Sequence, residues 1–198
     1  HWDAVTEWYD TLVGPEGSEY HRHVVIPGVL GLLDFERDKR VLDVACGQGV
    51  LCRAMAKRGA EVVGIDAAAG LIDAARQHND REPLPVSYHV GDAAGLASLA
   101  DEHGLAGRFD AATCTLAIQN IAVLSPVWRG CRAALREGGR LIVVMMHPCF
   151  RIPKESGWGW RPDKNQPGGG VEFRRVESYL TGRKTPIQMH PGSAPELT

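Results

Sequence analysis

From position 40 onward, short apolar stretches alternate with longer stretches whose apolar positions recur at helical spacing. Strands are predicted at 40–45, 61–66, 86–91, 109–114 and 140–146, and helices at 50–58, 67–77, 94–102 and 125–136. Strands and helices that alternate at these lengths form βαβ units. We therefore predict an α/β protein with a doubly wound, mainly parallel sheet, whose ligand site lies outside the carboxyl ends of the strands.

The last predicted helix and strand have clear boundaries in the sequence. Ser125 stands where an N-cap is expected, and Pro126 stands at the first helical position. Glu137-Gly138-Gly139 ends this helix, and the strand that follows is apolar on both faces. A strand of that kind is predicted to lie in the centre of a parallel sheet.

The pattern divides the chain into three parts. Residues 1–35 are rich in aromatic residues and histidine, with helices predicted at 3–13 and 20–33. Residues 36–150 form the α/β core. Residues 151–198 are rich in proline and glycine, and we predict a loop and a hairpin there rather than another βαβ unit.

Composition narrows the class of protein. The 198 residues carry a formal net charge of −2, so no basic footprint for nucleic acid is visible. The five cysteines form no CxxC pair and lie in apolar segments, so we expect reduced thiols and a cytoplasmic protein. No apolar run reaches the ~18–20 residues of a membrane span, so no membrane partner is predicted. His21 and His23 form the pattern HxH, which does not place both rings on one helix face, so no metal site is predicted.

The turn after the first predicted strand carries the main chemical signal. Asp43 precedes Cys46-Gly47-Gln48-Gly49, and glycines at such a turn let a ligand approach the backbone. A dinucleotide site needs GxGxxG, but Cys52 occupies the third glycine position. Asp43 would also repel a pyrophosphate in a site of low dielectric and attract a cation. S-adenosylmethionine carries a sulfonium and an ammonium group and no phosphate, so it suits this turn better.

Five motifs follow one another at the ends and beginnings of the predicted strands. They are Asp43-Val44-Ala45-Cys46-Gly47-Gln48-Gly49, Gly64-Ile65-Asp66, Val90-Gly91-Asp92-Ala93, Phe109-Asp110-Ala111-Ala112 with Leu116, and Leu135-Arg136-Glu137-Gly138-Gly139-Arg140-Leu141. In this order they resemble the motifs of the class I S-adenosylmethionine-dependent methyltransferases, in particular small-molecule members of the type-11 kind. The resemblance covers about residues 36–147 and implies a Rossmann-like methyltransferase fold.

The chain departs from the family pattern in three places. Ala45 stands where the family often has a glycine, and it fits if no positive φ is required there. Ala68 replaces a common serine, which removes a helix cap. The family sheet normally closes with a further helix and an antiparallel strand pair, which residues 151–198 do not convincingly supply. We expect that the chain is truncated or incomplete at its C-terminus, or that its closing strands are atypical.

The resemblance implies the contacts to the cofactor, S-adenosylmethionine. Asp66 matches the acid that holds the ribose hydroxyls, Asp92 matches the acid that meets the adenine amino group, and Leu71 would lie under the adenine. The family often places an N-terminal helix as a lid over the cofactor, which assigns that role to residues 1–35. The implied cofactor contacts are Tyr9, Asp43, Ala45, Cys46, Gly47, Gly49, Asp66, Ala67, Leu71, Gly91, Asp92, Ala93, Thr115 and Leu116.

The methyl acceptor is predicted to meet a second set of residues, and residues 151–198 are placed on the substrate side. The predicted acceptor contacts are Tyr20, His21, Gln119, Asn120, His147 and Trp158. His147 ends the last strand, so it is the candidate catalytic base for a substrate hydroxyl or amine. A hydrogen bond to the adjoining loop explains His147 as well, helix capping explains Asn120, and packing within a hairpin explains Trp158.

These observations predict a methyltransferase that acts on a small-molecule acceptor. An NAD(P)-dependent oxidoreductase is the alternative enzyme, and Asp43 and Cys52 disfavour it. A non-catalytic methyltransferase-like partner subunit is the other alternative, but the acids and glycines of the motifs are intact. A nucleic-acid methyltransferase is disfavoured because no (D/N)PPY sequence follows the fourth strand. The acceptor, the acceptor atom and the oligomeric state stay open.

Overall fold

The computed structural model describes residues 2–34, 39–102, 104–147, 155–165, 168–177, 179–181, 186–187 and 196–197. The chain forms two compact units, His1–Met145 and Met146–Thr198. The N-terminal helical segment and the α/β core therefore belong to the same unit.

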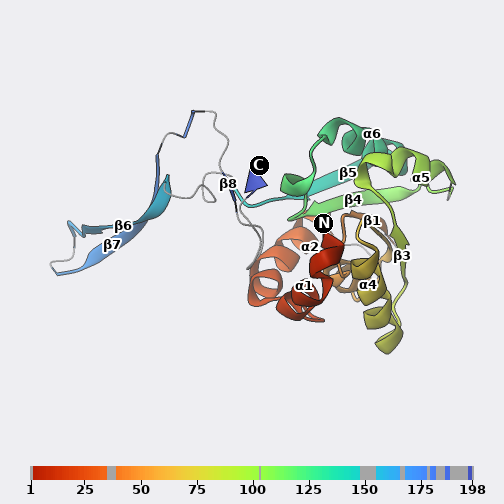
Figure 1. The fold of residues 1–198 in the computed structure, drawn as a ribbon, viewed down its shortest axis with the longest axis horizontal. Helices are drawn as coiled ribbons and strands as arrows, with labels where there is room; N and C mark the ends of the chain where they lie inside the picture. The colour runs from red at the N-terminus through yellow and green to blue at the C-terminus, as the bar shows by residue number, and fades with distance from the viewer. Residues whose placement is uncertain are drawn as a thin grey trace. The chain divides into compact units, whose positions relative to one another are not determined.

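Five parallel strands form the sheet of the first unit (Figure 1). They are β1 (Arg40–Val44), β2 (Glu61–Asp66), β3 (Val86–Val90), β4 (Phe109–Thr115) and β5 (Leu135–Val144). Their order in the sheet is β3-β2-β1-β4-β5. The chain adds β2 and β3 on one side of β1 and then β4 and β5 on the other side, so the topological switch point lies between β1 and β4. The prediction of a doubly wound, parallel sheet is confirmed.

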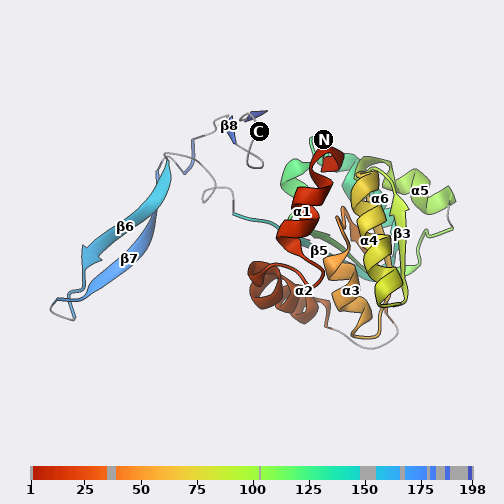
Figure 2. The ribbon, with the colours of Figure 1, turned by 60° about the horizontal axis from the view of Figure 1, so that its bottom comes forward.

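Helices cover both faces of this sheet (Figures 1 and 2). Alternate strand residues point to opposite sides, and apolar strand residues pack against helices on each side. Val41 of β1 packs in one cluster with Val29 and Met55, whereas Leu42 packs in a second cluster with Val127. The first cluster lies under α2 (Ile26–Leu33), α3 (Val50–Ala56) and α4 (Ala69–Arg81), and the second lies under α5 (Leu96–Glu102) and α6 (Leu124–Ala134).

Short helices complete the first unit. They are η1 (Trp2–Val5), α1 (Thr6–Val13), the π-helix η2 (His21–Val25), η3 (Ala93–Gly95) and η4 (Ile118–Asn120). Within the described residues, no helix has the length and apolar character that crossing a bilayer requires.

Two expectations about α6 and β5 are wrong. The chain enters α6 from the extended residue Val123, without a side-chain hydrogen bond at the cap, so Ser125 is not the N-cap. β5 begins at Leu135, before the glycine pair that was expected to end the helix. Among the strands that the described residues form, β5 lies at one edge of the sheet, and Ile142 is its one buried residue.

The second unit contains an antiparallel hairpin of β6 (Ser156–Pro162) and β7 (Gly170–Val176). Trp158 of β6 is 68% exposed, and the guanidinium of Arg174 lies 5.4 Å from the centre of its ring. The strands β8 (Pro186–Ile187) and β9 (Glu196–Leu197) pair with each other. Among the described residues, no antiparallel strand joins β5.

Candidate cofactor-binding site

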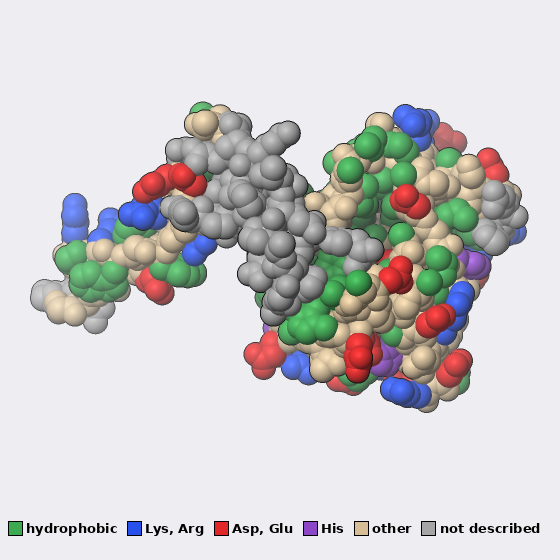
Figure 3. Space-filling view, in the orientation of Figure 1, with side chains coloured by type: hydrophobic (Ala, Val, Ile, Leu, Met, Phe, Trp, Pro, Cys, Tyr) green, Lys and Arg blue, Asp and Glu red, His purple; other side chains and the backbone are tan. Residues whose placement is uncertain are grey.

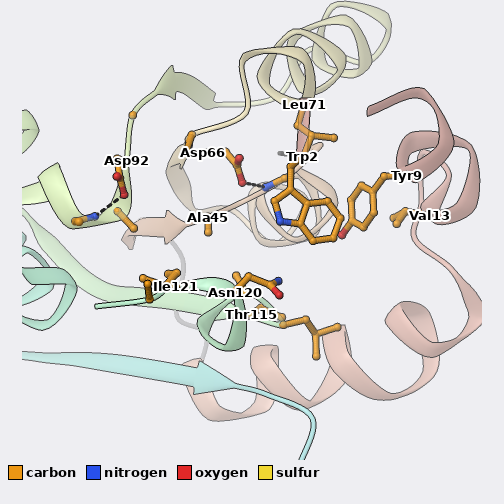
Figure 4. Close-up of a pocket in the computed structure, with 18 of the residues that line it drawn as sticks. Trp2, Tyr9, Val13, Ala45, Asp66, Leu71, Asp92, Thr115, Asn120 and Ile121 are labelled. Carbon is orange, nitrogen blue, oxygen red and sulfur yellow. Dashed lines mark hydrogen bonds between the residues drawn. The ribbon is translucent and has the colours of Figure 1, made fainter. Parts of the chain in front are cut away.

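A pocket of about 560 Å³ opens at the carboxyl ends of β1, β2, β3 and β4, the edge at which a doubly wound sheet binds its ligand (Figure 4). The residues that end or follow these strands and line the pocket are Ala45, Gly47, Asp66, Ala67, Gly91, Asp92, Thr115 and Leu116. The N-terminal segment contributes Trp2, Tyr9, Leu12, Val13, Ser18 and His21. The remaining lining residues are Leu71, Ala93, Ala94, Ala117, Asn120, Ile121, Ala122 and Val123.

The glycine turn after β1 needs left-handed backbone at three positions. Gly47 and Gly49 have φ of +56° and +78°, and Ala45 has φ of +57°. The condition under which Ala45 was expected to fit, that no positive φ is required, is therefore not met. A Cβ in this region costs roughly 1–2 kcal/mol because it approaches the next carbonyl oxygen. Ala45 is thus a strained residue that directly lines the pocket.

The two glycines of this turn have different roles. A Cβ added to Gly47 would meet the Tyr9 ring at 3.5 Å, an ordinary contact distance, and Gly47 lines the pocket. A Cβ added to Gly49 would lie 2.4 Å from the Tyr88 hydroxyl oxygen, and Gly49 does not line the pocket. Gly49 therefore permits the packing of Tyr88 under the turn, whereas Gly47 leaves its backbone open to a ligand.

Asp66 joins the glycine turn to the beginning of α4. Its carboxylate accepts hydrogen bonds from the backbone N–H of Gly47 at 2.8 Å (Figure 4) and of Ala68 at 2.9 Å. Burial raises the pKa of Asp66, and these two hydrogen bonds oppose that effect by stabilising the charged form. The carboxylate lines the pocket and keeps lone pairs that can accept hydrogen bonds from a pair of ligand hydroxyls.

Asp43 lies beside the main pocket and is not part of its lining. It lies within β1, it is 2% exposed, and it accepts hydrogen bonds from Thr113 Oγ1 at 2.6 Å and Cys52 Sγ at 3.2 Å. It lines only a small adjoining cavity of about 30 Å³. Burial raises the pKa of Asp43 to about 6. Burial also raises the pKa of the pocket residue Tyr9, and the charges of Asp66 and Asp43 raise it further.

The pocket is acidic. Asp66 and Asp92 line it, and its described lining contains no lysine or arginine. In the space-filling view of the first unit, the visible lysine and arginine side chains lie towards the edges (Figure 3). Asp92 accepts a hydrogen bond from Ala94 N at 2.9 Å, which leaves its second carboxylate oxygen for a ligand (Figure 4). Such a pocket favours a cationic ligand and repels a pyrophosphate.

One lining residue has an unused polar atom. Thr115 Oγ1 is buried and has no hydrogen-bond partner within the described structure. A buried hydroxyl without a partner is costly, so this atom is suited to a bound molecule. Together with the acids, the open backbone at Gly47 and the apolar side chain of Leu71, it forms a set of residues that fits S-adenosylmethionine.

The N-terminal segment is attached to α4 by two acidic residues. Asp3 accepts a hydrogen bond from the backbone N–H of Gly70 at 2.9 Å, in the first turn of the helix. Asp3 thereby supplies a cap, which Ala68 does not, from a position 67 residues away. Asp10 Oδ1 lies 2.9 Å from His78 Nε2 in the last turn of α4. The cap that Asp3 supplies to α4 could not be predicted from the sequence because Asp3 and Gly70 are remote from each other in the chain.

A buried arginine attaches the same segment to the glycine turn. Arg53 is 5% exposed and donates hydrogen bonds to the carbonyl oxygens of Gln48 and Pro15, each at 2.7 Å. Its guanidinium also donates to Gln48 Oε1 at 2.7 Å, and Gln48 Nε2 donates to Gly14 O at 2.6 Å. The loop between the N-terminal helices is therefore fixed to the turn that lines the pocket.

Some predicted contacts lie outside the pocket lining. Tyr20 is 45% exposed, and Gln119 Nε2 donates to Leu116 O at 2.6 Å instead of lining the pocket. Cys46 lines only the small cavity. His147 stacks on Tyr179 with ring centres 6.0 Å apart. His147 and Trp158 belong to the second unit, so their roles at the site stay predictions.

Several lining residues were not predicted. They are Trp2, Leu12, Val13, Ser18, Ala94, Ala117, Ile121, Ala122 and Val123. Most of them are apolar, and an apolar position on a helix usually indicates core packing. Only the docking of the N-terminal segment and of the loop after β4 decides which of them face the pocket.

Comparison with known proteins places the chain in a family. A sequence profile described as "Methyltransferase domain" matches residues 42–143, which is more than half of the chain. The chain belongs to the methyltransferase domain family. The matched residues contain β2 to β4, most of β1 and β5, and the glycine turn, together with both lining acids.

Two relatives are named ubiquinone biosynthesis O-methyltransferase. The protein of Coxiella burnetii is 30% identical over 152 residues, which cover 75% of this chain and 61% of the relative. The protein of Idiomarina loihiensis is 31% identical over 167 residues, which cover 79% of this chain and 65% of the relative. The methyltransferase domain described here thus spans less than two thirds of the length of these relatives.

A crystal structure of an S-adenosylmethionine-dependent methyltransferase from Mesorhizobium loti has the same fold. It superimposes with a TM-score of 0.63 at 24% identity, covering 88% of this chain and 70% of that chain. The predicted Rossmann-like methyltransferase fold is confirmed.

Proposed function

We propose that the chain is an S-adenosylmethionine-dependent methyltransferase that acts on a small-molecule acceptor. The observation that carries the proposal is an acidic pocket, without lysine or arginine among its described lining residues, at the carboxyl ends of four parallel strands. In a chain of the methyltransferase domain family, such a pocket suits a sulfonium cofactor and opposes the nicotinamide dinucleotides, which carry a pyrophosphate.

Each part of the cofactor has a residue that suits it. Asp66 would accept hydrogen bonds from the ribose hydroxyls, and the free oxygen of Asp92 would accept one from the adenine amino group. Leu71 offers an apolar surface to the adenine, and the open backbone at Gly47 faces the pocket. When bound, the cofactor supplies an electrophilic methyl group on a sulfonium.

The residues of this chain would orient the reactants and exclude water. Asp3, Asp10 and Arg53 hold the N-terminal segment against the core, which supports a role for residues 1–35 as a lid over the cofactor. A fixed wall on that side limits the orientations of both reactants, and orientation is a large part of the rate enhancement in such reactions. The negative field of Asp66 and Asp43 favours a cationic donor in the pocket.

We propose a hydroxyl group as the methyl acceptor, because both of the relatives compared are named O-methyltransferases. Leu12, Val13 and Val123 make part of the pocket apolar, which suits an uncharged acceptor better than nucleic acid. The second unit stays assigned to the substrate side, with His147 as its candidate base. A cytoplasmic location belongs to the same proposal and is supported by the four free thiols among the described cysteines.

Calorimetric titration with S-adenosylhomocysteine and with NAD⁺ tests the proposal. We expect the first to bind and the second not to bind. Asp66→Asn should weaken the binding of S-adenosylhomocysteine at least tenfold, because hydrogen bonds to a charged group contribute about 1.5–3 kcal/mol. Asp73→Asn, an exposed change on α4, is the matched control and should bind as wild type. Binding of NAD⁺ alone would refute the proposal and support an oxidoreductase.

A further inference from the structure

His21 lies beside the glycine turn, where this turn lines the pocket. It lines the main pocket and also the small adjoining cavity, whose other walls include Cys46, Gly47 and Val50. The backbone around it is closely packed, because a Cβ added to Gly17 would lie 2.7 Å from His21 Cβ and 3.1 Å from Val50 Cγ2. His21 is therefore held next to the first residue of α3.

The ring of His21 is oriented by a serine. Ser18 Oγ lies 2.8 Å from His21 Nδ1. Burial lowers the pKa of His21, so the ring is neutral near pH 7. When the serine hydroxyl donates to Nδ1, the proton of the neutral ring is on Nε2, which becomes a hydrogen-bond donor. His21 also begins the π-helix η2, and π-helical turns frequently occur at functional sites.

The methyl donor has a requirement that the acids of the pocket do not meet. Its amino-acid end carries an ammonium group and a carboxylate. The negative charge of Asp43 suits the ammonium group, but the carboxylate needs a hydrogen-bond donor. Among the described residues that line either cavity, there is no lysine or arginine, and His21 is the one histidine.

We infer that His21 Nε2 donates a hydrogen bond to the carboxylate of the methyl donor, with Ser18 fixing the ring. The inference rests on the proposed function and makes it more specific. It also moves His21 from the predicted acceptor contacts to the donor contacts. Besides His21 and the acids Asp43, Asp66 and Asp92, the ionisable groups that line these cavities are Tyr9 and Cys46. Burial raises the pKa of both, so they are neutral near pH 7.

The binding of two nucleosides distinguishes a contact between His21 and the cofactor carboxylate from a general effect of His21 on the pocket. S-adenosylhomocysteine carries the amino-acid end, and 5′-methylthioadenosine does not. We expect His21→Ala to weaken the binding of S-adenosylhomocysteine about tenfold or more and to leave that of 5′-methylthioadenosine within twofold in calorimetric titration at pH 7.5. His23→Ala, an exposed histidine in the same π-helix, should change neither affinity.

Two further variants keep the test decisive if alanine disturbs the packing at Gly17. His21→Phe keeps a ring but removes the donor, so it should lose affinity for S-adenosylhomocysteine selectively. His21→Gln keeps an N–H donor, so it should recover part of that affinity. An equal loss for both nucleosides, or no loss in His21→Phe, overturns the inference while leaving the proposed function intact. A wild-type protein that binds neither nucleoside refutes the proposed function itself.

Discussion

Ala45 allows the strain in the glycine turn to be measured by a pair of substitutions. Its φ of +57° is almost the same as the +56° of Gly47, two residues further along the same turn. One position carries a Cβ and the other does not. The structure therefore predicts that Ala45→Gly stabilises the protein and that Gly47→Ala destabilises it.

The two changes should be similar in size and opposite in sign. Removing the Cβ of Ala45 relieves roughly 1–2 kcal/mol of left-handed strain. A glycine also makes the unfolded chain more flexible, which costs about 0.4–1 kcal/mol. The net gain for Ala45→Gly is therefore about 1 kcal/mol, or about 2–4 °C in Tm for a chain of this length. Gly47→Ala should lose about the same amount because its added Cβ meets Tyr9 at an ordinary contact distance.

Thermal and urea unfolding of the two single variants and of the double variant test this reasoning. The double variant, with alanine and glycine exchanged, should unfold close to the wild type. A loss of stability in Ala45→Gly comparable to that in Gly47→Ala would refute the strain argument. It would mean that the methyl group of Ala45 contributes packing that exceeds the backbone strain.

Two other predictions concern buried charges. The folded-state pKa of Asp43, about 6, lies above its ordinary value of 3.8, so the folded protein binds the proton more tightly. The free energy of unfolding therefore falls by about 2 kcal/mol as pH rises from 4 to 6, out of about 3 kcal/mol over the whole titration. In urea unfolding across this range, Asp43→Asn should remove that fall, and an unchanged slope would contradict the assignment. Arg53→Met leaves the carbonyl groups of Gln48 and Pro15 without their donor and should cost about 3 kcal/mol. The control is the exposed change Arg58→Met, which should alter the free energy of unfolding by no more than about 0.5 kcal/mol. Equal stability of the two variants would show that the buried guanidinium of Arg53 does not stabilise the N-terminal loop.

Much of the fold was visible in the sequence because it depends on local patterns. The alternation of apolar stretches with helical periodicity depends on neighbouring residues, and it predicted every strand of the sheet and its parallel winding. The position of Asp66 at the end of β2, and of Gly47 in the first turn, also follows from local spacing along βαβ units. These residues face the pocket because the carboxyl ends of parallel strands meet at one edge.

Other features were decided only by contacts between remote parts of the chain. Asp3 caps α4 across 67 residues, and no local pattern links the two. The positive φ of Ala45 follows from the path of the turn between β1 and α3. The sequence by itself thus determined the order of the elements and the acids at their ends. The tertiary structure decided which side chains of the N-terminal segment enclose the pocket, because that depends on how the segment docks against the core.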